Sequence, residues 1–152
     1  MRAILASAAV ALLALAAGAG QQNPAPGKTK DSHLPPGYTI PEQDVKRENP
    51  VKPTEASIAA GAKYYSSQCA MCHGKDGNGQ GDLAKQMELK MPDLRKAESL
   101  APFTDGELFY ILTNGMGKMV GEGDRTPDAK KWDVINYMRS LSKSKAGEKP
   151  QS

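Results

Sequence analysis

The sequence has few aromatic residues, since Phe, Trp and Tyr make up only 5% of its 152 residues. A chain of this composition can build only a thin apolar core, and small domains with thin cores commonly depend on cross-links or on a bound group. Only two cysteines are present, Cys69 and Cys72. Two thiols so close together do not form a disulfide framework and instead indicate a metal, redox or cofactor-attachment site.

Strong charge of one sign is also lacking. The formal net charge is +3, but residues 54–142 contain 11 Lys and Arg against 12 Asp and Glu, a net charge of −1. Proteins that bind nucleic acid usually carry a pronounced basic stripe. The sequence therefore predicts no nucleic-acid partner.

Long apolar runs are absent after the N-terminal end of the chain. Arg2 is followed by the short apolar run 4–17 and by the small residues Ala17-Gly18-Ala19, which is the pattern of a cleaved export signal. In the alternative, the run stays as a membrane anchor, but it is shorter than the roughly 20 residues that a spanning helix needs. We expect residues 1–19 to be a signal peptide and the protein to be periplasmic or otherwise exported, with no transmembrane segment in the mature chain.

The rest of the chain divides by composition into three parts. Residues 20–53 hold seven of the 11 prolines and show almost no apolar periodicity, so they predict a linker or arm. We favour disorder for this arm; the alternative is a strap that packs on the domain through Leu34, Tyr38, Ile40 and Val45. Residues 54–142 form the expected folded domain, and residues 143–152 form a basic, flexible tail.

Three helices are predicted within the domain. The first follows the N-cap Thr54 and runs to about Ser67. The second begins with a capping box at Thr104–Glu107 and ends at Asn114-Gly115. The third opens at Thr126-Pro127-Asp128, with a cap followed by proline in the first turn. No segment alternates as a strand would, so the domain is expected to be all-α.

The cysteines belong to the sequence Cys69-Ala70-Met71-Cys72-His73, a C-x-x-C-H motif that is the attachment signature of c-type haem. Two thiols at this spacing can each form a thioether with one porphyrin vinyl group, and the histidine is then held beneath the iron. A thioredoxin-like pair would require a βαβ pattern, which is missing. A structural zinc site would require four ligands, but the only other histidine is His33 in the arm.

With this motif in place, the chain resembles class I cytochromes c, in particular the bacterial monohaem proteins. The resemblance rests on 61–74 around the motif, on the Gly-rich stretch 74–81 and on 132–141, which is similar to the C-terminal helix of that family. It implies three main helices with long Gly/Pro-rich loops around one covalently bound haem c. The first and last helices are expected to cross, with Gly61 allowing close approach and Tyr65 and Tyr137 packing at the crossing.

The resemblance also implies the ligands and contacts of the haem. Cys69 and Cys72 would attach it, His73 would be the proximal ligand, and Met119 would be the sixth ligand, although Val120 replaces the proline that usually follows. Met116 is the rival of Met119. Further expectations concern packing: Pro92 and Leu94 on the haem, Trp132 on a propionate or in the core, and Met87, Met91 and Met138 as packing residues.

A haem iron with both axial positions filled leaves no site for oxygen or peroxide, which favours electron transfer over catalysis. The sequence therefore predicts an electron carrier rather than an enzyme, with redox proteins as partners whose identity the sequence does not specify. One alternative is a cytochrome subunit of a larger dehydrogenase or oxidase. The other is a five-coordinate haem sensor or enzyme, if neither methionine binds.

Overall fold

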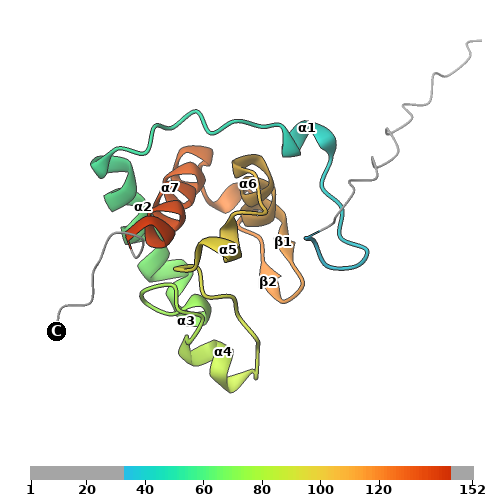
Figure 1. The fold of residues 1–152 in the computed structure, drawn as a ribbon, viewed down its shortest axis with the longest axis vertical. Coiled ribbons are helices and arrows are strands. Elements are labelled where there is room, and N and C mark those ends of the chain that lie inside the picture. Colours follow the sequence, from blue (N-terminus) through green and yellow to red (C-terminus); the bar gives the residue numbers. More distant parts are fainter. Residues whose placement is uncertain (1–32, 145–152) are drawn as a thin grey trace, which may run out of the picture.

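The computed structural model describes residues 33–144, which fold mainly as helices (Figure 1). The predicted signal peptide, the first part of the arm and nearly all of the basic tail lie outside these residues. The helices are α1 (Glu42–Val45), α2 (Glu55–Gln68), α3 (Ala70–His73), α4 (Asp82–Gln86), α5 (Ala97–Leu100), α6 (Asp105–Asn114) and α7 (Asp128–Ser144). Strands β1 (Gly115–Met116) and β2 (Met119–Val120) form an antiparallel ribbon, and η1 (Gly123–Arg125) is a 3-10 turn. None of the helices in 33–144 is long and apolar enough to cross a bilayer.

The crossing of α2 with α7 is the main helix contact of the fold. Gly61 lies at the crossing, where a Cβ atom would stand only 2.0 Å from the Asp133 carbonyl oxygen. The Tyr65 and Tyr137 rings pack beside it, with 5.1 Å between their centroids. The expected close approach at Gly61 is therefore confirmed, and so is the all-α fold with three main helices.

The starts of α2 and α6 follow the predicted capping residues. The Thr54 side chain accepts a hydrogen bond from the Ser57 amide at 3.2 Å. At α6 both halves of the capping box form, because Thr104 Oγ1 accepts from the Glu107 amide and Glu107 accepts from the Thr104 amide. These bonds satisfy amides that the first turn of a helix would otherwise leave unpaired.

The core lies among α2, α6 and α7. Trp132 is 2% exposed and stacks on Phe109 with 4.2 Å between ring centroids. The other large buried apolar side chains are Tyr65, Leu94, Leu100, Leu108, Ile111, Leu112, Val134, Ile135 and Met138. Two roles were expected for Trp132, and its burial among apolar side chains fits the filling of the core.

Residues 33–53, called the strap below, run along one side of the molecule, past α6 and α7 and on to α2 (Figure 1). Helix α1 lies against α6, where a Cβ on Gly106 would stand 2.0 Å from the Asp44 carbonyl oxygen. The Tyr38 hydroxyl donates to the Gly115 carbonyl at 2.5 Å, and the Arg47 guanidinium lies 4.0 Å from the centre of the Phe109 ring. Over these residues the arm packs as the strap alternative described, and the disorder that we favoured is wrong.

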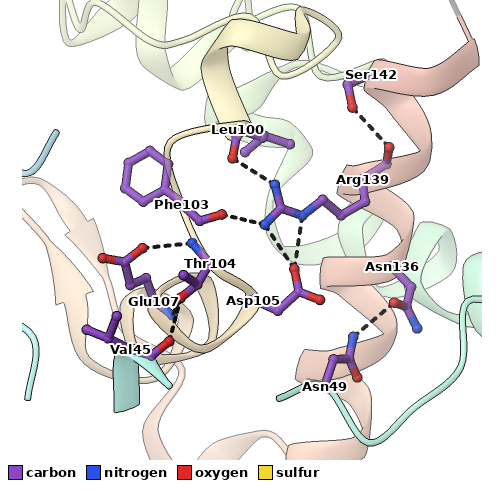
Figure 2. Close-up of polar contacts among 10 residues, drawn as sticks. All are labelled: Val45, Asn49, Leu100, Phe103, Thr104, Asp105, Glu107, Asn136, Arg139 and Ser142. Atoms are coloured by element: carbon purple, nitrogen blue, oxygen red, sulfur yellow. Dashed lines mark hydrogen bonds and ion pairs between the residues drawn. The ribbon is translucent and has the colours of Figure 1, made fainter. Parts of the chain in front are cut away.

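Polar contacts fasten the strap at Val45 and at Asn49 (Figure 2). Thr104 Oγ1 donates to the Val45 carbonyl at 2.8 Å. The side-chain amide of Asn49 donates to the side-chain oxygen of Asn136 on α7 at 2.9 Å. Beside them, Arg139 of α7 donates to Asp105 and to the carbonyls of Leu100 and Phe103. The loop before α6 and the chain before α2 are thus both fastened to α7.

Candidate haem-attachment site

The C-x-x-C-H motif forms a single helical turn directly after α2. The Cys69 amide donates to the Tyr65 carbonyl, and the amides of Cys72 and His73 donate to the Cys69 carbonyl at 3.2 and 2.9 Å. Because the motif is helical, Cys72 and His73 follow Cys69 by about one turn, and the cysteine pair and the histidine are held in fixed orientations. The turn ends at Gly74, whose φ of 81° lies in the region that favours glycine.

The Gly-rich loop 74–81 folds back onto this turn. The Gly79 amide donates to the His73 carbonyl at 2.8 Å, and the Gly81 amide donates to the Cys72 carbonyl at 3.2 Å. The Tyr65 hydroxyl donates to the Gly74 carbonyl at 3.0 Å. The free carbonyls of the motif are therefore used within the loop, which fixes the turn from its C-terminal side.

Burial sets the protonation of two side chains in the motif. It raises the pKa of the Cys69 thiol to about 12, with smaller contributions from Glu122 and Cys72. It lowers the pKa of His73, so the imidazole is neutral at pH 7. Buried His73 Nδ1 has no hydrogen-bond partner among the described residues.

These observations fit a haem held by this motif. A neutral imidazole is the form of histidine that binds a metal. No hydrogen bond to Nδ1 from the described residues holds the His73 ring in place. Within residues 33–144 no three His, Cys, Asp or Glu side chains converge to hold a metal ion, and this includes Cys69, Cys72 and His73. Cys69, Cys72 and His73 therefore do not suit a zinc site, whereas two thiols and one imidazole on a single helical turn would suit two thioether bonds to vinyl groups and one bond to the haem iron.

The two candidate sixth ligands lie on the short ribbon. Met116 and Met119 are directly opposite each other across the strands, so their side chains share one face. Met119 packs against the core together with Cys69, whereas Val120, on the other face, is 78% exposed. The ribbon therefore turns its methionine face toward the protein. Sequence patterning missed this ribbon because each strand has only two residues.

The other residues predicted to contact the haem or to pack are distributed unevenly. Leu94 and Met138 are buried in the core, as expected for packing residues. Met91 is partly buried, and Pro92 is exposed. Met87 is 50% exposed, so its assignment as a packing residue is wrong.

One polar cluster near the motif carried no signal in the sequence. The Tyr64 hydroxyl on α2 donates to Glu122 Oε2 at 2.8 Å and contacts the Thr126 hydroxyl. Thr126 in turn donates to the same carboxylate at 3.1 Å. Glu122 and Thr126 lie 58 and 62 positions after Tyr64 in the chain. No local pattern in the sequence can therefore predict the cluster.

Comparisons with known proteins agree with this geometry. The family model described as cytochrome c oxidase, cbb3-type, subunit III matches residues 56–138. A solved chain of the Kuenenia stuttgartiensis reducing HAO-like protein complex is similar in structure, with a TM-score of 0.54 and 25% identity over 72% of this chain and 52% of that chain. This protein thus spans about half the length of that chain. No curated protein matches.

The matched residues begin inside α2 and end inside α7, so they include the attachment motif, the ribbon and both crossing helices. They also make up more than half of the 152-residue chain. The helical fold, the C-x-x-C-H turn and the family match lead to one conclusion: this chain belongs to the c-type cytochromes of that family, which transfer electrons through covalently bound haem c.

Proposed function

We propose that the protein is an exported carrier of single electrons, with one haem per chain attached through Cys69 and Cys72. His73 and Met119 would hold its iron. The observation that carries the proposal is the C-x-x-C-H turn itself, in which the buried Nδ1 of half-buried His73 has no partner among the described residues while Cys69 packs on the same core as Met119 of the ribbon. The proposed domain is 54–142, preceded by a signal peptide at 1–19.

In this proposal the haem supplies reversible one-electron chemistry, and the protein supplies attachment, ligands and exclusion of water. The helical turn fixes the two thiols relative to the imidazole. A methionine thioether as second ligand favours ferrous iron and raises the reduction potential. If His73 and Met119 both hold the iron, no position is left for oxygen or peroxide, which supports electron transfer over catalysis.

The test compares Met119→Ala with Met116→Ala. We expect Met119→Ala to abolish the weak red absorption band of sulfur-ligated ferric haem and to lower the potential, since the ligand that favours ferrous iron is lost. Met116→Ala is the matched control on the same face of the ribbon, and it should change neither property. The reverse result would transfer the ligand role to Met116. Ready binding of carbon monoxide by the reduced unmodified protein would instead support the sensor or enzyme alternative.

A second candidate is a cytochrome subunit of a larger redox complex. It is supported by the oxidase-subunit description of the family model and by the solved relative, which is part of a complex. Size-exclusion of a native extract, followed by haem staining, separates the two. A haem signal at the mass of the free chain supports the carrier, and a signal that elutes with much larger proteins supports the subunit.

Export is tested by sequencing the N-terminus of the protein recovered outside the cytoplasm. We expect the chain to start near Gly20, because the small-residue site ends at Ala19. A chain that keeps Met1 and fractionates with membranes would contradict the cleaved signal.

A further inference from the structure

The cluster of Tyr64, Glu122 and Thr126 joins three separate segments beside the attachment motif. Tyr64 is on α2, five residues before Cys69, and Glu122 follows the ribbon, three residues after Met119. Thr126 lies just before α7 and is 4% exposed. The cluster thus connects the helix that leads into the C-x-x-C-H turn with the segment that carries Met119.

The hydrogen bonds of the cluster meet on one carboxylate. Both the Tyr64 and the Thr126 hydroxyls use Glu122 Oε2, and the Glu122 side chain is only 18% exposed. Burial, and to a lesser extent the Glu122 carboxylate, raise the pKa of the Tyr64 phenol. The phenol therefore keeps its proton and donates, and bonds from hydroxyls to a charged acceptor are stronger than bonds between neutral groups.

The backbone beside Glu122 is fixed as well. The Glu122 amide donates to the Leu112 carbonyl of α6 at 2.8 Å, and a Cβ on Gly121 would stand 2.4 Å from the Thr113 carbonyl oxygen. Arg125 donates to the Gly121 carbonyl at 2.7 Å and lies 3.9 Å from Glu122. The chain leaving β2 is therefore held against α6 by its backbone and against α2 by the cluster.

From this arrangement we infer that Tyr64, Glu122 and Thr126 are positioning residues for the sixth ligand. They hold the ribbon at a fixed distance from α2, so that the Met119 thioether and the His73 imidazole are presented to the same haem. Loss of the cluster should leave the haem attached and the helices folded, but it should let the ribbon withdraw more easily. The inference rests on the proposed ligation by Met119.

The experiment measures imidazole binding to the oxidised holoprotein, because imidazole enters only when the sixth ligand leaves. Tyr64→Phe removes one hydroxyl and keeps the ring. We expect it to tighten the apparent affinity for imidazole by roughly fivefold, the equilibrium effect of one ordinary hydrogen bond. Glu122→Gln keeps an acceptor oxygen but loses the charge that strengthens the bonds, so it should tighten imidazole binding less than Tyr64→Phe does, whereas Glu122→Ala should reproduce the effect of Tyr64→Phe.

Ser57→Ala is the matched control. The Ser57 hydroxyl also ties α2 to α7, by donating to Asp133 at 2.5 Å and accepting from Asn136 at 2.9 Å, but it makes no contact with the ribbon segment. Ser57→Ala should lower the free energy of unfolding in urea by about as much as Tyr64→Phe does, while its affinity for imidazole stays unchanged. Such a split separates a positioning role from a general loss of stability.

The outcomes distinguish this inference from the proposed function. If the unmodified protein shows the sulfur-to-iron band and Tyr64→Phe binds imidazole no more tightly than Ser57→Ala, the inference is overturned while Met119 ligation stands. If Tyr64→Phe and Glu122→Gln tighten imidazole binding equally, the charge of Glu122 acts rather than the hydrogen bonds, and this result also overturns the inference. If the unmodified protein lacks the band, the ligation by Met119 and the inference both fall.

Discussion

Replacing Gly61 by alanine sets two effects of opposite sign against each other. Alanine is the better helix former and, on its own, would stabilise α2 by about 1 kcal/mol. At this crossing, however, the new Cβ would stand 2.0 Å from the Asp133 carbonyl oxygen and 2.9 Å from the Tyr137 Cβ. Both neighbours belong to helical backbone or to its first side-chain atom, so no rotamer change relieves the contact, and α7 has to move away.

The steric clash with α7 should outweigh the higher helix propensity of alanine. Overpacking typically costs about 1–3 kcal/mol, and a clash with backbone belongs at the upper end of that range. We therefore expect Gly61→Ala to lower the free energy of unfolding by about 1–2 kcal/mol after the propensity gain is subtracted. For a domain of this size that corresponds to a fall in Tm of roughly 4–10 °C.

The assay is urea and thermal unfolding of the holoprotein, followed by circular dichroism. Ser66→Ala is the control: Ser66 is exposed on the same helix, so the change should alter stability by no more than about 0.5 kcal/mol. If Gly61→Ala is as stable as the unmodified protein, the close crossing of α2 and α7 is refuted.

Three other perturbations test the strap, the buried phenol and the attachment. Deleting residues 33–49 should leave the haem absorption spectrum unchanged but cost about 2–4 kcal/mol of stability in urea, from the lost hydrogen bonds and cation–π contact; an unchanged stability would argue against a strap. Burial, with smaller effects of Cys69, Tyr137 and Asp76, raises the pKa of Tyr65, while the unfolded chain loses this proton at about pH 10. The contribution of the protonated Tyr65 phenol to the free energy of unfolding is therefore complete below about pH 10 and is lost as the pH rises further. Tyr65→Phe should flatten the alkaline decline in stability that urea titrations measure. The double change of Cys69 and Cys72 to Ala should abolish haem staining on a denaturing gel; extraction of haem from the unmodified protein by acidified organic solvent would disprove covalent attachment.

Local patterns in the sequence predicted the elements whose causes are local. Thr54 and the Thr104–Glu107 box cap their helices because each satisfies amides within the same turn. The crossing at Gly61 was predicted through the family resemblance and is confirmed by the structure.

Features that depend on distant residues were not predictable in this way. The strap has no periodicity of its own, and its docking depends on the absence of a side chain at Gly106 and on the face of the Phe109 ring that Arg47 covers. The Tyr64 cluster likewise joins residues about 60 positions apart. Charged or hydroxyl side chains of this kind are common on helix surfaces, and only the fold determines which of them meet.

The strap also orders the events of folding along the chain. Its partners lie far away in sequence: Gly115 is 77 residues from Tyr38, Asp128 is 81 from Arg47, and Asn136 is 87 from Asn49. Closing loops of this length is entropically costly and slow compared with forming local contacts.

The hydrogen bonds of the attachment turn are local by comparison, since the one between Tyr65 and Gly74 spans nine residues. A chain that emerges from its N-terminus presents the strap first but cannot dock it until α6 and α7 have followed. We therefore expect Cys69 and Cys72 to pass through an interval in which their turn has formed while the strap is still undocked. Docking of the strap is expected to come last, once the chain has emerged as far as α7.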